Sequence, residues 1–288
     1  MKVGFIGAGK VGYSLGKYFS LHAVSLSGFY SKSSDSSKDA ALFTGSSFYS
    51  SADDLIKDSD IIFITVPDGK IKEVADNLPK ALLNNKTICH CSGALTADEA
   101  FSNLKDSNAH FYSVHPLCAV SDKYKSYLEL DKVYFFIEGD ENNITFIKDF
   151  LTKANLKVNT LKAENKVKYH LAAAIISNHV IALAKMATNL FNQCGFSDDD
   201  ALKALGALML NNVKHILNDG IKDSLTGPVQ RADVSTVQKH LNALDDLCDK
   251  QLYTLLSKQL LLIAREKTPS LDFSNLEALL NATNKDLK

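Results

Sequence analysis

Three glycines near the amino terminus have the spacing of a site that binds a dinucleotide. Gly7, Gly9 and Gly12 form a G-x-G-x-x-G motif directly after the apolar run KVGFI and directly before KVGYSLGKYF, which has helical spacing. The first glycine permits a tight turn, the second lets the backbone approach a pyrophosphate, and the third lets the helix pack against the strand. The helix amino terminus adds free N–H groups and the positive end of a dipole. The alternative is an apolar strand with a glycine-loosened turn, but the flanking elements favour the dinucleotide site.

The residues after the next expected strand indicate which dinucleotide binds. An NAD site usually has an acidic residue there, which holds the ribose 2′-hydroxyl. The strand AVSLSGFY is instead followed by Ser31, Lys32 and Ser33, and no acid comes before Asp35. Two hydroxyls and an ammonium suit a 2′-phosphate, so we predict NADP(H). The alternative is an ordinary solvated turn that binds NAD weakly.

Two later loops leave the carboxyl ends of expected strands. TVPDGKI contains Val66, Pro67 and Asp68, and HCSGAL contains Ser92 and Gly93. Each is a common turn by itself, but both fall on the sheet edge where the nicotinamide and its ribose would lie. The predicted cofactor-binding residues are Gly7, Ala8, Gly9, Lys10, Val11, Gly12, Ser31, Lys32, Ser33, Val66, Pro67, Asp68, Ser92 and Gly93.

The elements that must position these loops alternate between short β-branched or aromatic runs and helical patterns, as βα units do. The run DIIFITVP has no alternation, which is typical of a parallel strand covered on both faces. We therefore expect an α/β domain over residues 1–162, with a doubly wound, mainly parallel Rossmann sheet. Its strands are expected at 2–6, 24–30, 60–66, 87–91, 110–114 and 133–137.

Residues 163–288 show helical patterns only, so we expect a second, all-α domain for substrate binding and dimerisation. The run LAAAIISNHVIALAKMATNLF is apolar almost all round, which is too much for one solvent-facing helix. We expect it to form the central helix of this domain and part of a homodimer interface. The expected helices cover roughly 164–193, 198–219, 234–266 and 274–283.

Composition limits the class of partner. The 288 residues are 45% hydrophobic and 23% charged, with a formal net charge of -1 at pH 7. We expect neither nucleic acid nor a membrane surface as a partner, because no basic stripe or polybasic segment is present. No stretch approaches roughly 18 uninterrupted apolar residues, and the apolar start is too short for a signal peptide. Five cysteines without framework spacing indicate a reducing compartment, so we expect a cytoplasmic protein.

Three cysteines near histidines could be assembled into a metal site. Cys89 and Cys91 share one face of an expected strand, and Cys118 follows in HPLC. That separation suits packing as well as ligation, and free cysteine commonly behaves as a small buried hydrophobe. We therefore expect no metal.

Seven segments together resemble a known family. They are GAGKVG, YSKS, TVPDGKI, HCSGAL, SVHPL, KYHLAAAIISN and TGPVQRADVSTVQKHL. Over nearly the whole chain they resemble the family that joins a Rossmann-like NADP-binding domain to a C-terminal helical domain of unknown function. Members with an assigned activity look like an alternative ketopantoate reductase, which makes pantoate for pantothenate and coenzyme A synthesis. The architecture is more distantly similar to 6-phosphogluconate dehydrogenase, pyrroline-5-carboxylate reductase, prephenate dehydrogenase and deazaflavin-dependent NADP reductases.

Reduction of a carbonyl by NADPH needs a proton donor or polariser for the developing alkoxide, and histidine is the usual donor near neutral pH. His115 lies just past the carboxyl end of an expected strand, before Pro116. There it resembles the catalytic histidine of prephenate dehydrogenases, although it could instead only bridge the two domains. His170 and Asn178 share one face of the expected central helix, with Ala174 between them.

On that helix the sequence departs from the pattern of the families that it resembles. Relatives often carry a lysine and an asparagine four apart, the lysine acting as proton donor. If Asn178 matches that asparagine, Ala174 occupies the lysine position. His170 or His115 then replaces the donor, unless Lys166 or Lys168 reaches in from the helix start. A polar residue buried at a domain or subunit contact is the alternative for His170.

Buried amides need partners, so Asn178 is expected to find them in the cleft. Arg231, the only arginine besides Arg265, lies in a glycine-proline loop and suits the bidentate recognition of a substrate carboxylate. The alternative for Arg231 is an ion pair with Asp233. Asp233 and Ser235 are the two candidate caps of the helix that follows. Ser92 is the second predicted substrate contact.

These residues predict an NADPH-dependent oxidoreductase that acts on a small 2-oxo acid, and the family resemblance implies ketopantoate as its substrate. A second possibility is reduction of a cyclic imine, as in pyrroline-5-carboxylate reductase, although the Ser-Pro-Gly run of that family is absent. A third is a sensor that binds NADP(H) without turnover, which Ala174 in the lysine position supports.

Overall fold

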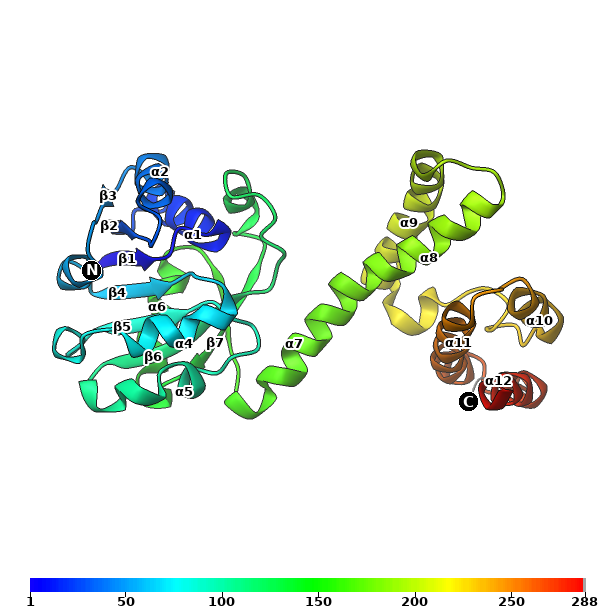
Figure 1. Ribbon diagram of the computed structural model, residues 1–288. Coiled ribbons are helices and arrows are strands. Elements are labelled where there is room, and N and C mark those ends of the chain that lie inside the picture. Colours follow the sequence, from blue (N-terminus) through cyan, green and yellow to red (C-terminus); the bar gives the residue numbers. More distant parts are fainter. Residues whose placement is uncertain (287–288) are drawn as a thin grey trace. The chain divides into compact units, whose positions relative to one another are not determined.

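The computed structural model describes residues 1–286, with side chains described to residue 283. The chain forms two compact units, Met1–Asn178 and His179–Lys288. Strands end at residue 160, shortly before the change at 162/163 that the sequence pattern indicates, and the first unit continues into the following helix. Each unit is considered separately below (Figure 1).

The first unit is built on one eight-stranded sheet with the order β3-β2-β1-β4-β5-β6-β7-β8. All neighbouring strands are parallel except β6 and β7. This confirms the predicted doubly wound, mainly parallel sheet. The strands are β1 (Lys2–Ile6), β2 (Ser25–Tyr30), β3 (Ser47–Phe48), β4 (Ile61–Ile64), β5 (Thr87–His90), β6 (His110–Pro116), β7 (Tyr134–Gly139) and β8 (Lys157–Thr160).

Strand β4 shows why its sequence has no polar alternation. All four of its residues are fully buried. Ile61 and Phe63 belong to the apolar core on one face of the sheet, and Ile62 and Ile64 to the core on the other face. Helices therefore cover both faces, as the continuous apolar run predicts.

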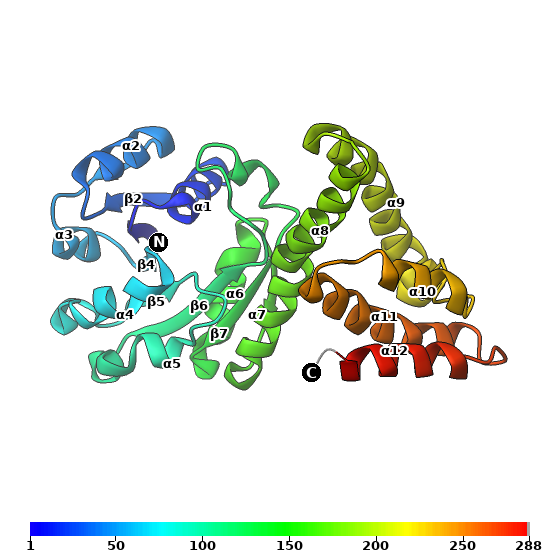
Figure 2. The same ribbon diagram turned by 45° about the vertical axis from the view of Figure 1, so that its right-hand side comes forward.

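Helices α1 and α6 contribute to the first of these cores, and helices α3, α4 and α5 to the second. Figure 2 shows α4 and α5 on one side of the sheet. The helices of this unit are α1 (Lys10–Leu21), α2 (Ser34–Thr44), α3 (Ala52–Lys57), α4 (Asp68–Asp76), α5 (Ala97–Ala100), α6 (Ile144–Lys153) and α7 (Lys166–Ala174).

The sequence prediction missed the two edge strands. Strand β3 has only two residues, and three of the four residues of β8 are exposed. Edge strands this short or this polar carry no apolar run to detect. They extend the sheet at its two edges.

The second unit is helical, as predicted, but the expected helix over 234–266 is wrong. Two helices replace it, because Asp246 accepts a hydrogen bond of 2.9 Å from the N–H of Asp249 and begins a new helix. Gly220, with φ of 83°, also interrupts α9. The helices are α8 (Val180–Gln193), α9 (Asp198–Ser224), α10 (Val234–Asn242), α11 (Leu247–Lys267) and α12 (Ser274–Asp286).

The predicted helix over 164–193 contains a π-turn, Ile175–His179, between α7 and α8. By length and composition alone, Ala163–Gln193 could cross a membrane: its mean hydropathy is 1.4, and only 6% of its most apolar window is buried. No run of 18 uninterrupted apolar residues occurs, as expected, but the mean hydropathy of this segment reaches that of a membrane span. Polar residues such as Asn178 and Lys185 interrupt the apolar run, but the mean hydropathy of the segment stays high. One such helix is weak evidence for a membrane.

Candidate functional site

The glycine-rich loop between β1 and α1 lies tightly against the end of β4. Gly7 has φ of +106°, and a Cβ there would stand 2.8 Å from Val66 Cγ1 and 2.9 Å from the carbonyl oxygen of Thr65. A Cβ at Gly12 would stand 2.5 Å from Thr65 Oγ1, which itself donates a 2.7 Å hydrogen bond to the Gly7 carbonyl. The third glycine thus lets α1 approach the residue that follows β4.

The start of α1 has the free donors that an anion needs. Gly9 is its N-cap and supplies no side-chain cap, and the first turn contains no acidic residue. Backbone N–H groups at a helix amino terminus bind phosphate well. Together with the crowded glycines, this end of the helix fits a pyrophosphate.

The turn after β2 carries the residues predicted for a 2′-phosphate. Ser31, Lys32 and Ser33 connect Tyr30 to α2, and Lys32 is exposed. Ser33 also caps α2, since its hydroxyl accepts from the N–H of Ser36 at 3.4 Å. The first acid is Asp35, inside the first turn of α2.

The two loops after β4 and β5 are joined by one short hydrogen bond. The buried Ser92 hydroxyl donates to Asp68 Oδ2 at 2.6 Å, and it accepts from the N–H of Leu95 at 3.1 Å. Asp68 opens α4 directly after Pro67. The structure thus brings together the two loops that the sequence places at one edge of the sheet.

Two histidines converge on Gly93 in the second of these loops. A Cβ at Gly93 would stand 2.5 Å from His170 Nδ1 and 2.9 Å from His115 Nε2. The two imidazole rings are nearly perpendicular, with centroids 6.0 Å apart. His170 Nδ1 is buried and has no hydrogen-bond partner among the described residues. A small polar group above Gly93 could therefore meet both rings.

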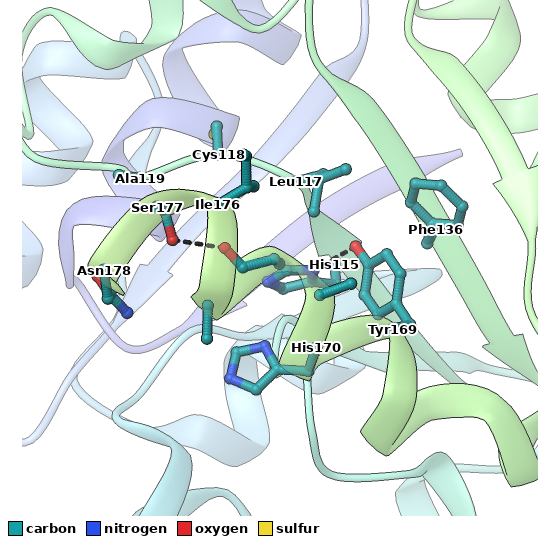
Figure 3. Close-up of a pocket in the computed structure, with 13 residues that line it drawn as sticks. His115, Leu117, Cys118, Ala119, Phe136, Tyr169, His170, Ile176, Ser177 and Asn178 are labelled. Atoms are coloured by element: carbon teal, nitrogen blue, oxygen red, sulfur yellow. Dashed lines mark hydrogen bonds between the residues drawn. The ribbon is translucent and has the colours of Figure 1, made fainter. Parts of the chain in front are cut away.

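Tyr169 contacts His115, and sequence reasoning missed it. Its hydroxyl lies 2.7 Å from His115 Nδ1 (Figure 3). Burial raises the pKa of Tyr169, and burial, aided by the charges of Lys166 and His170, lowers the pKa of His115 to about 4. At neutral pH the phenol keeps its proton and the imidazole is uncharged. With Tyr169 donating to Nδ1, the remaining proton of His115 lies on Nε2, toward Gly93.

A cavity of about 500 Å³ opens beside the two histidines. His115, Tyr169, His170, Ser177 and Asn178 provide polar side chains, and no lysine, arginine or carboxylate is among its described lining residues. Figure 3 shows the remaining wall as mainly apolar side chains and the helix backbone. The other lining residues are Leu117, Cys118, Ala119, Phe136, Ala172, Ala173, Ala174 and Ile176.

Asn178 lies at the edge of this cavity in a way the sequence did not indicate. It belongs to the π-turn and is exposed. The argument that a buried amide must find partners therefore does not apply to it. Ala174, the position where relatives often have lysine, also lines the cavity.

The other candidates lie outside the cavity lining. Lys166 is buried with Nζ on Ser113 Oγ, and Lys168 is exposed. Arg231 belongs to the second unit, where it is exposed between α9 and α10. Asp233 caps α10 by accepting from the N–H of Thr236 at 3.0 Å. No ion pair of Arg231 occurs among the described residues, but hydrogen bonds from Thr236 and the nearby charge of Arg231 both lower the pKa of Asp233.

The cysteines do not form a cluster in this structure. Cys89 is fully buried in β5, and Cys118 is exposed. Within residues 1–286, no group of three or more His, Cys, Asp or Glu side chains is placed to hold a metal ion.

Comparison with known families agrees with this architecture. Residues 1–116 match the model of a Rossmann-like domain, and residues 133–260 match a domain of unknown function, DUF2520. The chain is a Rossmann-like domain joined to a DUF2520 domain. The resemblance carried by the seven sequence segments is thereby confirmed at the level of these two domains. The chain shares its fold with a solved NADP+-bound enzyme, which is described below.

Individual proteins are similar over different lengths. An L-aspartate dehydrogenase of Methanocaldococcus jannaschii is 31% identical over 110 residues, which are 37% of this chain and 40% of that protein. The chain thus spans 40% of the length of this curated relative. A solved protein of Thermotoga maritima is 26% identical with a TM-score of 0.73, over 92% of this chain and 99% of that one. An imine reductase of Myxococcus stipitatus in complex with NADP+ shares 14% identity and a TM-score of 0.64, over 94% of this chain and 95% of that one.

Proposed function

We propose that this chain is an NADPH-dependent reductase of a small 2-oxo acid, with ketopantoate as substrate and pantoate as product. One observation carries the proposal: His115 Nε2 and His170 Nδ1 converge on Gly93 beside the cavity. Gly93 follows β5 and His115 ends β6, so the pair lies at the carboxyl edge of the sheet, where ligands of doubly wound folds bind.

The residues present fit an NADP(H) cofactor. Gly7 to Gly12 and the start of α1 would hold the pyrophosphate, and Ser31, Lys32 and Ser33 the 2′-phosphate. Val66, Pro67, Asp68 and Ser92 would line the nicotinamide half. When bound, the reduced nicotinamide supplies a hydride to the substrate carbon.

His115 and His170 divide the work on the substrate oxygen. Neutral His115, with its proton on Nε2, donates a hydrogen bond that polarises the carbonyl and stabilises the developing alkoxide. His170 is the proposed proton donor, because its Nδ1 is buried without a hydrogen-bond partner among the described residues and faces Gly93. The carbon thus gains a hydride and the oxygen gains a proton.

The cavity lining supports an aliphatic substrate. Leu117, Ala173 and Ile176 give it an apolar wall, and Asn178 offers an amide for a hydroxyl. A substrate carboxylate needs a cation that this lining lacks, so we assign that role to Arg231, an exposed arginine without an ion pair among the described residues. Whether Arg231 acts within its own chain or in a second copy is part of the test below.

Reduction of an imine is the second candidate. The solved imine reductase of Myxococcus stipitatus shares the fold. A protonated imine, however, is cationic and is best balanced by a carboxylate, and none is among the described residues that line the cavity. This favours the neutral carbonyl. The sensor without turnover, which Ala174 supports, is the third outcome of the same assay.

We further propose a homodimer in the cytoplasm, formed through the helical domain, with no membrane or nucleic-acid partner. Large apolar side chains are exposed on this chain, and exposed apolar patches mark interaction surfaces. In a homodimer, the matching apolar surface of a second copy would cover them. Sedimentation in buffer without detergent should give a dimer, whereas a requirement for detergent would favour a membrane. Such exposed residues on α8 and α9 include Ile181, Leu202, Leu208, Leu210, Leu217 and Ile221.

The experiment that tests the function follows NADPH oxidation by ketopantoate, with NADH in parallel. Arg231→Lys, which keeps the charge but loses the planar fork, should raise KM for the keto acid more than it lowers kcat. Mixing Arg231→Ala with His115→Ala chains should restore part of the activity only if the arginine acts in a second copy.

A further inference from the structure

Lys166 is the most deeply buried cation of the first unit and lies outside the cavity. Its side chain is 1% exposed, and Nζ lies 2.5 Å from Ser113 Oγ and 4.0 Å from Glu138 Oε2. Glu138 is buried as well and accepts from the N–H of Ala97 at 2.9 Å. Burying an ion pair costs several kcal/mol of desolvation per ion, and apolar residues of similar volume often serve stability as well. A contribution to folding stability alone therefore does not explain why a lysine is buried at position 166.

The hydrogen bonds of Lys166 lead to the loop that carries Gly93. Ser113 Oγ, which accepts from Lys166, donates to the carbonyl oxygen of Ser92 at 3.1 Å. The N–H of Ser92 donates to His90 Nδ1 at 3.1 Å, and its hydroxyl donates to Asp68. Every polar group of Ser92 is thus held, and Gly93 is the next residue.

The same contact also joins the two elements that carry the histidines. Ser113 lies two residues before His115 on β6, and Lys166 lies one helical turn before His170 on α7. In a strand, residues two apart point to one face, and in a helix, residues four apart do so. The Lys166–Ser113 bond therefore fixes β6 and α7 together directly beside the two histidines.

The charge of Lys166 acts on His115 as well. Burial is the largest cause of the lowered pKa of His115; Lys166 and His170 lower it further, and Asp68 raises it. Tyr169 faces the other ring nitrogen. Burial lowers the pKa of Lys166 itself to about 8, with Glu138, Cys91, Asp68 and Glu99 opposing, so the lysine is still mainly charged at pH 7.

We propose that Lys166 is a positioning residue: through Ser113 it holds β6, α7 and the Gly93 loop in register, and its charge disfavours a second positive charge on His115. The role in turnover rests on the proposed reductase function. The electrostatic part does not, because it concerns the free protein.

The test uses the full chain with Lys166→Met, Ser113→Ala and, as a matched control on an exposed helix end, Lys153→Met. The pH titration of the His115 ring is followed by NMR, with its signal assigned by its loss in His115→Gln. Lys166→Met should raise the midpoint of His115 and lower kcat at least about tenfold, with NADPH affinity within about twofold of the parent. Ser113→Ala keeps the cation, so it should lower kcat while the midpoint moves much less.

Two results would overturn the proposal. A folded Lys166→Met with the parent's His115 midpoint removes the electrostatic role, and Ser113→Ala and Lys166→Met with the parent's kcat remove the positioning role. If no substrate is reduced by the parent, the proposed function fails, but the NMR titration still decides the electrostatic claim. Should Lys166→Met fail to fold, Lys166→Gln and Ser113→Ala carry the same comparison.

Discussion

The hydroxyl of Tyr169 lies 2.7 Å from Nδ1 of His115, and the two rings meet edge to face with centroids 5.6 Å apart. Phe136 packs against the other side of the tyrosine, with a centroid distance of 4.6 Å. Tyr169 is therefore held in place, and burial raises the pKa of its phenol, which keeps its proton at neutral pH. This contact fixes which nitrogen of His115 can serve the substrate.

Replacing Tyr169 by Phe removes that donor and leaves the ring. The proton of His115 is then free to occupy Nδ1, so we expect kcat to fall about tenfold, in line with the loss of about 1 kcal/mol or slightly more for one hydrogen bond. Steady-state kinetics should show little change in KM for NADPH. An unchanged kcat would mean that the tautomer of His115 does not matter for the reaction.

Gly93→Ala tests the convergence of the two histidines. The new methyl would stand 2.5 Å from His170 Nδ1 and 2.9 Å from His115 Nε2, so one ring or the loop must move. We expect at least about a hundredfold loss of kcat/KM, since small misplacements of catalytic groups are this costly. Gly206→Ala, with nothing within 4 Å of the added Cβ, is the control and should keep full activity. Retained activity in Gly93→Ala would place the chemistry elsewhere.

Lys32→Ala tests the cofactor preference. Removing the exposed ammonium of the β2–α2 turn takes away the charge that faces a 2′-phosphate, so KM for NADPH should rise about tenfold while KM for NADH changes little. The ratio of kcat/KM for the two cofactors is the measurement. An equal effect on both would contradict the assignment of this turn.

Much of this arrangement follows from the sequence. The apolar run of β4 predicted a strand buried on both faces, and the G-x-G-x-x-G spacing predicted a crowded turn that Gly7 and Gly12 now show. The loops with Asp68 and Ser92 were expected at one edge because parallel strands end together, and a hydrogen bond joins them.

The remainder depends on tertiary contacts that have no local signature. Tyr169 matters because β6 brings His115 to it across 54 positions, and Lys166 matters because Ser113 lies opposite it. Asn178 was judged from an apolar helix pattern, which shows neither the π-turn nor the exposure of its side chain. The break between α10 and α11 depends on the N-cap at Asp246. Because the apolar spacing continues across this position, the sequence pattern predicts a single helix there.

Acid should destabilise the protein through its buried histidines. Burial is the main cause that lowers the pKa of His115 to about 4 and of His90 to about 3, whereas both titrate near 6.5 when unfolded. The stability is therefore complete above about pH 6.5 and falls as the pH drops, because only the unfolded chain binds these protons.

The variant His115→Gln removes the contribution of His115 to this pH dependence of stability. Between pH 5 and 6 the slope of unfolding free energy against pH should fall by about one proton, or about 1.4 kcal/mol per pH unit. Chemical denaturation at several pH values within this range measures that slope. A slope equal to the parent's would show that His115 takes up a proton in the folded protein as readily as in the unfolded one.

The proposed reaction is the reduction of a 2-oxo acid by NADPH, in which a neutral His115 polarises the carbonyl and His170 donates the proton. Its most direct test is the absorbance of the reduced nicotinamide during incubation with ketopantoate, for the parent, His115→Ala and His170→Ala. We predict that the parent oxidises NADPH faster than NADH. The rate of NADPH oxidation should fall at least about a hundredfold in each variant, whereas both variants should still bind NADPH. Tight NADPH binding without turnover of ketopantoate, or turnover that survives both substitutions, would contradict the proposed reaction.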